Sequence, residues 1–380
     1  MIVDFDYILK RIDFLINENQ NSKVYTSSVG VKLKIPVWIK AILKPFYHRI
    51  IRPYYIGIKQ VKREEEESQI SFLHPIALNF MEYFFIKNQR PYFDTSIYFE
   101  KNQDDDIIEF FDNRIISVIA GLRGKVKTAI QKEDIKNKKC LYNKVKKGKD
   151  GFYYLKINGE NEYILPVKYF AVDVFIHHYG LKKLSEEQKK YIENKDFLDI
   201  GAFCGDTCLA FLNYNPHRIY AYEPVKNTYD LLLKTTQRDN NNKIIPINKG
   251  VGEKVDSATI YADVLSPDCS SLVYGQGTRN SAHNVVEEQI EIATIDEECK
   301  DKKVGLIKMD IEGFEYYAIK GGLSTIQRDK PILLISIYHT AKDFFEIPPM
   351  IKAICPDYKF KYIDINPSDP IADKIFMAYI

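Results

Sequence analysis

From Lys195 onward, short apolar segments alternate with stretches of helical pattern, and this alternation constrains the possible fold more than any other feature. The segments expected to be strands are 197–200, 218–222, 244–247, 304–309, 331–337, 358–363 and 374–379. Strand–helix alternation predicts a mostly parallel sheet with helices on both faces. The last two segments lie too close together for a helical crossover, so we expect them to pair antiparallel.

The rest of the chain indicates a second domain. The 380 residues are 45% apolar and 28% charged, which is ordinary globular composition, and no apolar run is long enough for a transmembrane helix. We predict a mainly helical, basic accessory domain at 1–150 and a catalytic domain at 151–380. At the start of the catalytic domain, an Asn-Gly pair between residues 152–157 and 163–165 predicts a β-hairpin.

A glycine-containing turn follows the first of the expected parallel strands. Gly201 and Gly205 would let the backbone turn tightly and pass close to a ligand at the carboxyl end of that strand. Phe203 stands where a dinucleotide-binding loop has its middle glycine, which disfavours NAD or FAD. The sequence also has no phosphate-binding loop of the G-x-x-x-x-G-K-[ST] type.

Carboxylates end the first two strands. Asp199 precedes the turn, where it would suit the cationic amine and sulfonium of S-adenosylmethionine (SAM) and would repel a pyrophosphate. Glu223 follows 24 residues later, about where a Rossmann-like fold places its ribose-binding acid. Together with the glycines, these acids predict a SAM site.

A second acidic motif follows the fourth strand. Asp310 ends that strand, and Glu312 would share its face if the chain stayed extended. Glu315 opens the next helix, where an acid is favourable for structural reasons alone. His339 ends the fifth strand. Because parallel strand ends converge at one sheet edge, we expect Asp199, Glu223, Asp310 and His339 to cluster.

At this point the sequence resembles the FkbM-family SAM-dependent methyltransferases over about residues 150–380. The matching segments are Asp199-Ile200-Gly201-Ala202 with Gly205, Tyr222-Glu223-Pro224, Ser270-Ser271-Leu272, Ala293-Thr294-Ile295-Asp296, Ile307 to Glu315, Pro331 and His339. The resemblance implies an α/β, Rossmann-like class I methyltransferase fold with a seven-stranded sheet and an antiparallel C-terminal strand. It also implies O-methylation of a hydroxyl, commonly on a sugar of a surface glycan or on a natural product.

The resemblance further implies which residues bind the cofactor, with S-adenosylhomocysteine as its product. The expected SAM-binding residues are Asp199, Gly201, Ala202, Phe203, Gly205, Thr207, Glu223, Pro224, Asn248 and Asp310. The chain departs from the family pattern twice. Phe203 replaces the usual Asn, and Ser336 stands near the position where the family often has a Glu before the His, so a carboxylate that orients the His is missing or supplied from elsewhere.

Two ways of activating the acceptor hydroxyl stay open. Either His339, with its ordinary pKa near neutrality, or Asp310 acts as general base, with His339 slightly preferred. Alternatively, Asp310, Glu312 and Glu315 bind Mg²⁺, which the sequence does not favour, and His339 is then a core residue.

A Gly- and Ser-rich segment between the third and fourth strands is a candidate acceptor-binding loop. It carries Ser270, Ser271 and Tyr274, and we expect substrate contacts from these residues as well as from Glu312 and Glu315. A plain connection is the alternative, but the segment is longer than usual connections.

The net charge of +2 hides two opposed halves. Residues 1–150 carry 27 Lys/Arg against 19 Asp/Glu, and residues 151–380 carry 27 against 33. The basic, aromatic stretch at 32–63 suits either peripheral contact with an anionic membrane or packing within its own domain. The near-balance of charge argues against nucleic acid as a partner. Without a signal-peptide pattern, and with six cysteines whose spacing is not that of a disulfide scaffold, we expect a cytoplasmic protein, at most at the inner face of the membrane.

Three functions compete. The leading one is O-methylation of a carbohydrate in bacterial capsule or lipopolysaccharide biosynthesis, with a natural-product methyltransferase as its variant. A non-catalytic SAM-fold scaffold in a glycan-assembly complex is the second. An NAD-dependent oxidoreductase is the third, and Phe203 argues against it. The sequence leaves the oligomeric state open.

Overall fold

The computed structural model describes residues 2–3, 10, 83, 93–94, 137, 140–157, 159–239, 242–263, 285–365 and 373–380. The described residues from 137 onward belong to one compact unit, and those up to 94 belong to another. In the latter, β1 (Ile2–Val3) pairs antiparallel with β2 (Phe93–Asp94). The predicted helical domain and the stretch 32–63 lie almost wholly outside the described residues. The domain division near residue 150 therefore stays a prediction.

A seven-stranded sheet forms the centre of the second unit, and it confirms the predicted fold. Its strands lie in the order β14-β15-β13-β12-β6-β7-β8. The four pairings that join β13, β12, β6, β7 and β8 are parallel, and β15 runs antiparallel to both β13 and β14, as the short connection predicted. The bounds are β6 (Asp196–Ile200), β7 (Ile219–Tyr222), β8 (Ile244–Ile247), β12 (Val304–Met309), β13 (Ile332–Ser336), β14 (Lys359–Asp364) and β15 (Lys374–Tyr379).

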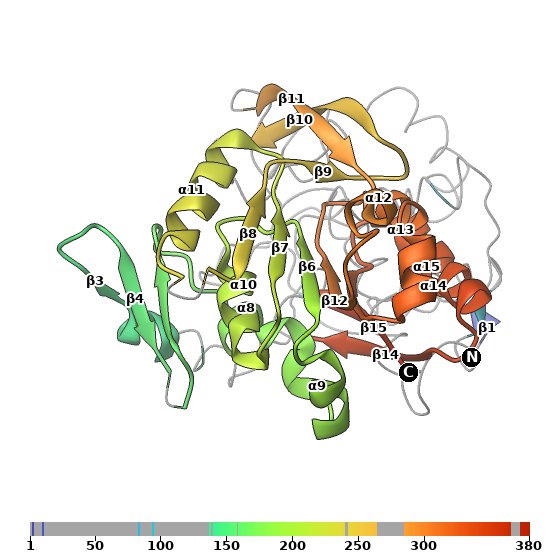
Figure 1. Cartoon of the computed structure of the whole chain (residues 1–380), viewed down its shortest axis with the longest axis horizontal. Helices are drawn as coiled ribbons and strands as arrows, with labels where there is room; N and C mark the ends of the chain where they lie inside the picture. Colours follow the sequence, from blue (N-terminus) through green and yellow to red (C-terminus); the bar gives the residue numbers. More distant parts are fainter. Residues whose placement is uncertain are drawn as a thin grey trace, which may run out of the picture. The chain divides into compact units, whose positions relative to one another are not determined.

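Helices pack on the sheet and bury its central strands. Every residue of β6, β12 and β13 is buried, as expected for parallel strands covered on both faces. Helix α11 lies beside β8, while α14 lies beside β12 (Figure 1). The helices are α8 (Val172–Phe175), η3 (His178–Lys183), α9 (Glu186–Ile192), α10 (Asp206–Phe211), η4 (Leu212–Tyr214), α11 (Lys226–Thr236), α12 (Ile295–Glu298), α13 (Glu315–Lys320), α14 (Leu323–Asp329) and α15 (Ala341–Ile354). Within the described part of the chain, no helix has the length and apolarity to cross a bilayer.

Two small sheets flank the main one. The predicted hairpin is confirmed, because β4 (Tyr153–Lys156) pairs antiparallel with β5 (Glu162–Leu165), and β3 (Lys146–Lys147) extends it. The other sheet was not expected from the sequence. In it, a long ribbon of β10 (Asp256–Asp263) and β11 (Val285–Ala293) carries β9 (Gly250–Val251) at its edge.

Candidate active site

The turn between β6 and α10 brings three strands together at their carboxyl ends. The amides of Gly201 and Ala202 both donate to the Tyr222 carbonyl of β7, at 3.0 Å. Gly201 has a φ of +80°, and a Cβ built on it would lie 2.0 Å from the Asp310 carbonyl oxygen of the neighbouring strand. No side chain fits at this position, so the backbone of the turn is pressed directly against the end of β12.

Phe203 occupies the middle of this turn in a left-handed conformation. Its φ is +47°, a region that Asn adopts more readily than a bulky residue does. This preference gives a physical reason for the Asn that the family usually has there. The Phe203 ring packs edge-on against Tyr169 with centroids 5.1 Å apart, and its amide donates to Glu223 at 3.1 Å. With Phe in place of Asn, the amide of residue 203 still donates to Glu223, and the ring adds an aromatic surface beside the turn.

Glu223 ends β7 and is buried. One carboxylate oxygen accepts from the Phe203 amide and the other from the Val225 amide at 3.0 Å. Burial raises the pKa of Glu223 to about 8, although these two amides act to lower it. Asn248 holds the same strand end, because its side-chain amide donates to the carbonyls of Glu223 and Pro224, each at 2.9 Å.

Asp199 is fully buried, and its partners all come from the protein. Its carboxylate accepts from the Thr207 hydroxyl at 2.5 Å and the Cys208 thiol at 3.1 Å. Its other oxygen lies 3.1 Å from Lys308 Nζ, which also donates to the Gly201 carbonyl at 2.6 Å. Burial acts to lower the pKa of Lys308, but the carboxylates of Asp199 and Asp310 outweigh it and hold that pKa above its usual value. Asp199 therefore holds the turn through Thr207 and through Lys308, which binds the Gly201 carbonyl.

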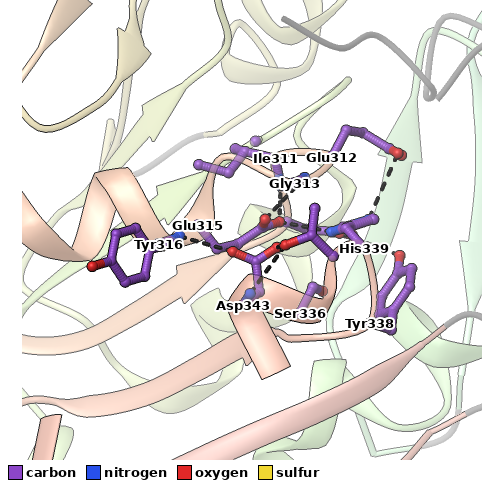
Figure 2. Close-up of polar contacts among 12 residues, drawn as sticks. Ile311, Glu312, Gly313, Glu315, Tyr316, Ser336, Tyr338, His339 and Asp343 are labelled. Atoms are coloured by element: carbon purple, nitrogen blue, oxygen red, sulfur yellow. Dashed lines mark hydrogen bonds and ion pairs between the residues drawn. The ribbon is translucent and has the colours of Figure 1, made fainter. Parts of the chain in front are cut away.

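The second acidic motif surrounds a buried histidine. Glu315, the first residue of α13, accepts from the amides of Ile311 and Gly313 at 2.8 and 2.9 Å, and its carboxylate lies 2.8 Å from His339 Nδ1 (Figure 2). The carboxylate partner that the family pattern placed before the His thus comes from another element. Asp343 lies behind this group, where it accepts from the Tyr316 amide at 3.0 Å.

Two more carboxylates approach the opposite nitrogen of the ring. His339 Nε2 lies 3.4 Å from Asp310 Oδ1 and 3.7 Å from Glu312 Oε2. The expectation that Glu312 shares a strand face with Asp310 was wrong in its geometry, because β12 ends at Met309 and Glu312 has a φ of +55°. The turn nevertheless aims both acids at His339.

The electrostatics of this cluster bear on the choice of general base. Burial acts to lower the pKa of His339, but Glu315, Glu312 and Asp310 together raise it to about 10. A histidine with that pKa carries a proton at neutral pH and does not accept another. Asp310 is the more open group, with 28% of its side chain exposed, and it accepts from the Tyr338 hydroxyl at 3.3 Å. The charge on His339 and the exposure of Asp310 therefore favour Asp310 over His339 as the candidate general base.

The comparisons with known proteins agree with this arrangement. Residues 199–362 match the family model of the methyltransferase FkbM domain. The chain contains a methyltransferase FkbM domain. The family uses SAM, as the resemblance implied. No curated protein matches the sequence.

Solved structures share the fold at low identity. The methyltransferase FkbM from Methylobacillus flagellatus KT is 18% identical, with 75% of this chain and 57% of that one covered and a TM-score of 0.44. The M. jannaschii tRNA m1G37 methyltransferase is 16% identical (60% and 55% covered, TM-score 0.30), and Aeropyrum pernix fibrillarin with bound SAM is 15% identical (62% and 97% covered, TM-score 0.33). The chain thus spans little more than half the length of the first two proteins. Likenesses this distant carry no information about the acceptor.

Three charged side chains around the turn after β6 were not singled out from the sequence. Lys308 is the clearest, since a single lysine inside an otherwise apolar, buried strand signals a buried ion pair. Asp206 is the first residue of α10, and burial raises the pKa of its carboxyl to about 7. Asp173 in α8 behaves alike, with a pKa raised to about 7 by burial and by the nearby Asp206. The acid directly after Gly205 was the only signal for Asp206, and no motif marked Asp173.

The structure brings together most, but not all, of the expected site. Gly201, the Asp199–Lys308 pair and Asp310 adjoin at the ends of β6 and β12, and Glu223 joins them through the turn. Ser270, Ser271 and Tyr274 lie outside the described residues, so the acceptor loop stays a prediction. Thr207 points to Asp199.

Proposed function

We propose that the FkbM domain is a SAM-dependent O-methyltransferase that methylates a hydroxyl of a carbohydrate during assembly of a bacterial surface glycan. One observation carries the proposal. A partly exposed carboxylate, Asp310, stands at the end of β12 immediately beside the Gly201 turn, so a proton acceptor and a cofactor turn meet at one point of the sheet. Methyl transfer to a hydroxyl needs these two functions side by side.

The residues at the turn fit SAM. Gly201 leaves a backbone cradle that a Cβ would fill, and each Glu223 oxygen takes one amide and keeps a lone pair for a ribose hydroxyl. Phe203 and Tyr169 offer aromatic surface beside that carboxylate. The cofactor, when bound there, supplies a methyl group activated by its sulfonium.

The protein's remaining task is to position the acceptor hydroxyl and to take its proton. Asp310 accepts the proton, while the Tyr338 hydroxyl donates to its carboxylate at 3.3 Å and His339 Nε2 lies 3.4 Å away, within ion-pair distance. Glu315 in turn fixes the His339 ring through Nδ1. General-base assistance of this kind typically contributes about 10²–10⁴-fold to a rate.

Binding and transfer experiments test the proposal. Isothermal titration of the full chain should show binding of SAM and none of NAD, and labelled methyl groups should pass from SAM to extracts of bacterial surface polysaccharide. If SAM binds and its methyl group passes to small natural products but to no glycan fraction, the acceptor is a natural product and the proposed carbohydrate acceptor is wrong. If SAM binds but no acceptor is methylated, the domain is a non-catalytic scaffold. If NAD binds, SAM is not the cofactor.

A variant pair tests the role of Asp310. Asp310→Asn keeps the shape of the side chain but removes the proton acceptor, so we expect the transfer rate to fall about 10²–10⁴-fold with SAM affinity unchanged. Glu298→Gln is the matched control, because Glu298 is similarly exposed and its only described ion pair is with Lys249. Equal rates for Asp310→Asn and wild type would remove Asp310 from the mechanism.

A further inference from the structure

We infer that the end of β13 is a divalent-cation site, in which His339 Nε2 and Asp310 Oδ1 are ligands and Glu312 is a third. The site lies in the same cluster as the proposed methyl transfer, but its existence does not depend on that activity. Only its chemical role rests on the proposed function.

The first argument is a buried ring nitrogen without a hydrogen bond. His339 is 1% exposed, and its Nε2 makes no hydrogen bond to the described residues. A buried polar atom left in this state is rare and costs free energy. The opposite nitrogen is bound by Glu315, whose own oxygens are held by the Ile311 and Gly313 amides. This is how metal-binding histidines are oriented, with one nitrogen on a carboxylate and the other aimed at the ion. A cation that binds Nε2 would displace the proton that the surrounding carboxylates otherwise keep on the ring.

The spacing of the facing atoms is the second argument. Nε2 lies 3.4 Å from Asp310 Oδ1 and 3.7 Å from Glu312 Oε2. Atoms bound about 2.0–2.2 Å from one cation lie about 3–3.6 Å from each other. Asp310, Glu315 and His339 form a group whose ligand atoms lie within 4.8 Å of one another, and Glu315 belongs to it from the Nδ1 side of the ring. A cation at Nε2 would bind Asp310 Oδ1 directly, and a shift of the Glu312 side chain would supply the third ligand.

Charge and ligand type indicate which cation would bind. Three carboxylates, those of Asp310, Glu312 and Glu315, converge on one imidazole. A dication would balance this excess of negative charge. Imidazole with carboxylates suits first-row transition ions better than Mg²⁺ or Ca²⁺, which prefer oxygen ligands alone. We therefore expect Mn²⁺ or Zn²⁺ in preference to Mg²⁺.

In the proposed reaction the cation would bind the acceptor hydroxyl oxygen. It lowers the pKa of that hydroxyl, so that the proton leaves to the second oxygen of Asp310 while the oxygen keeps its electron pair for the methyl group. The new O–CH₃ bond forms as the sulfonium C–S bond breaks, and that bond's electron pair stays on sulfur. Sugars with adjacent hydroxyls would gain most, because two oxygens can bind one cation.

The test is a titration of the full chain with Mn²⁺, in which the electron paramagnetic resonance signal of the free ion measures how much has bound. Wild type should take up about one Mn²⁺ per chain, and Mn²⁺ should raise its Tm. His339→Gln and Asp310→Asn should each weaken binding at least tenfold. His217→Gln is the matched control, because His217 also lies beside an acid, 2.8 Å from Asp196, but on an exposed part of the domain; it should bind like wild type.

The outcomes separate this inference from the proposed function. No Mn²⁺ or Zn²⁺ uptake by folded wild type, or equal uptake by Asp310→Asn, would overturn the cation site even if methyl transfer is observed. Uptake that depends on His339 and Asp310 supports the site even if no transfer to glycans occurs. Asp310 is partly exposed, so its variant should fold; if His339→Gln does not, the Asp310 result and the Tm shift decide.

Discussion

Replacing Gly201 by alanine should destabilise the domain far more than the same change at a comparable glycine elsewhere. Gly201 and Gly151 have similar left-handed backbones, with φ of +80° and +86°. A Cβ at Gly151 meets no atom within 4 Å, whereas a Cβ at Gly201 meets the Asp310 carbonyl oxygen at 2.0 Å. The pair therefore separates the cost of backbone conformation from the cost of crowding.

The expected magnitudes follow from these contacts. An L-residue in the left-handed region costs about 1–2 kcal/mol, and this is the whole cost at Gly151. At Gly201 the new carbon also sits well inside ordinary contact distance of a backbone atom, so β6 and β12 must separate, which adds about 1–3 kcal/mol. Gly205→Ala should fall between them, because its closest neighbour is the end of the Leu232 side chain, at 2.9 Å.

Thermal unfolding and SAM titration provide the assay. At about 2–4 °C per kcal/mol, the Tm should drop by about 3 °C for Gly151→Ala and about 10 °C for Gly201→Ala. SAM affinity should be lost only in the latter, since only there is the cofactor turn displaced. Equal Tm losses in the two variants would show that the strands separate without cost, and the close approach of the turn to Asp310 would then not hold the site.

Further variants probe the groups around the turn. Lys308→Met leaves Asp199 buried without its cation and should lower stability by about 3–5 kcal/mol in urea unfolding, whereas Thr207→Val should cost about 1–2 kcal/mol; equal losses would contradict the buried ion pair. Because the pKa of Glu223 is about 8, the folded protein binds more protons than the unfolded chain between about pH 4.5 and 8, so this group's contribution to stability falls as pH rises through that window. Ribose hydroxyls favour the ionised carboxylate, so SAM affinity should rise up to about tenfold per pH unit below pH 8 and level off above it. Glu223→Gln should remove that rise, and a rise of the same slope in the variant would assign it to other groups.

The main sheet and the location of the site could be predicted from the sequence, because both depend on where strands end. Asp199, Glu223, Asp310 and His339 each close a strand, and parallel strands bring their carboxyl ends to one edge. The ribbon of β10 and β11 was missed although Gln289 to Ala293 in β11 alternates polar and apolar residues, because a long segment separates β11 from its partner strand β10.

Side-chain partners were beyond what the sequence can show, because they depend on packing between distant segments. Asp199 was expected to face the cofactor, and the sequence did not show that its Oδ2 accepts from Thr207 and Cys208 or that its Oδ1 forms an ion pair with Lys308. The pairing of His339 with Glu315 spans 24 residues and two elements. A sequence pattern reveals which side chains lie at the carboxyl ends of the strands, but not which of them form hydrogen bonds or ion pairs with one another.

In the proposed reaction, the same contacts would couple cofactor binding to the chemistry at the acceptor. Lys308 joins the Asp199 carboxylate to the Gly201 carbonyl, so one buried cation holds the end of β6 and the cofactor turn together. That turn rests on the Asp310 backbone, whose side chain is the proposed proton acceptor. No flexible side chain intervenes at this junction. A displacement of the turn would therefore move Asp310. A cofactor that binds to the turn and fixes its conformation would also fix the position of the Asp310 carboxylate.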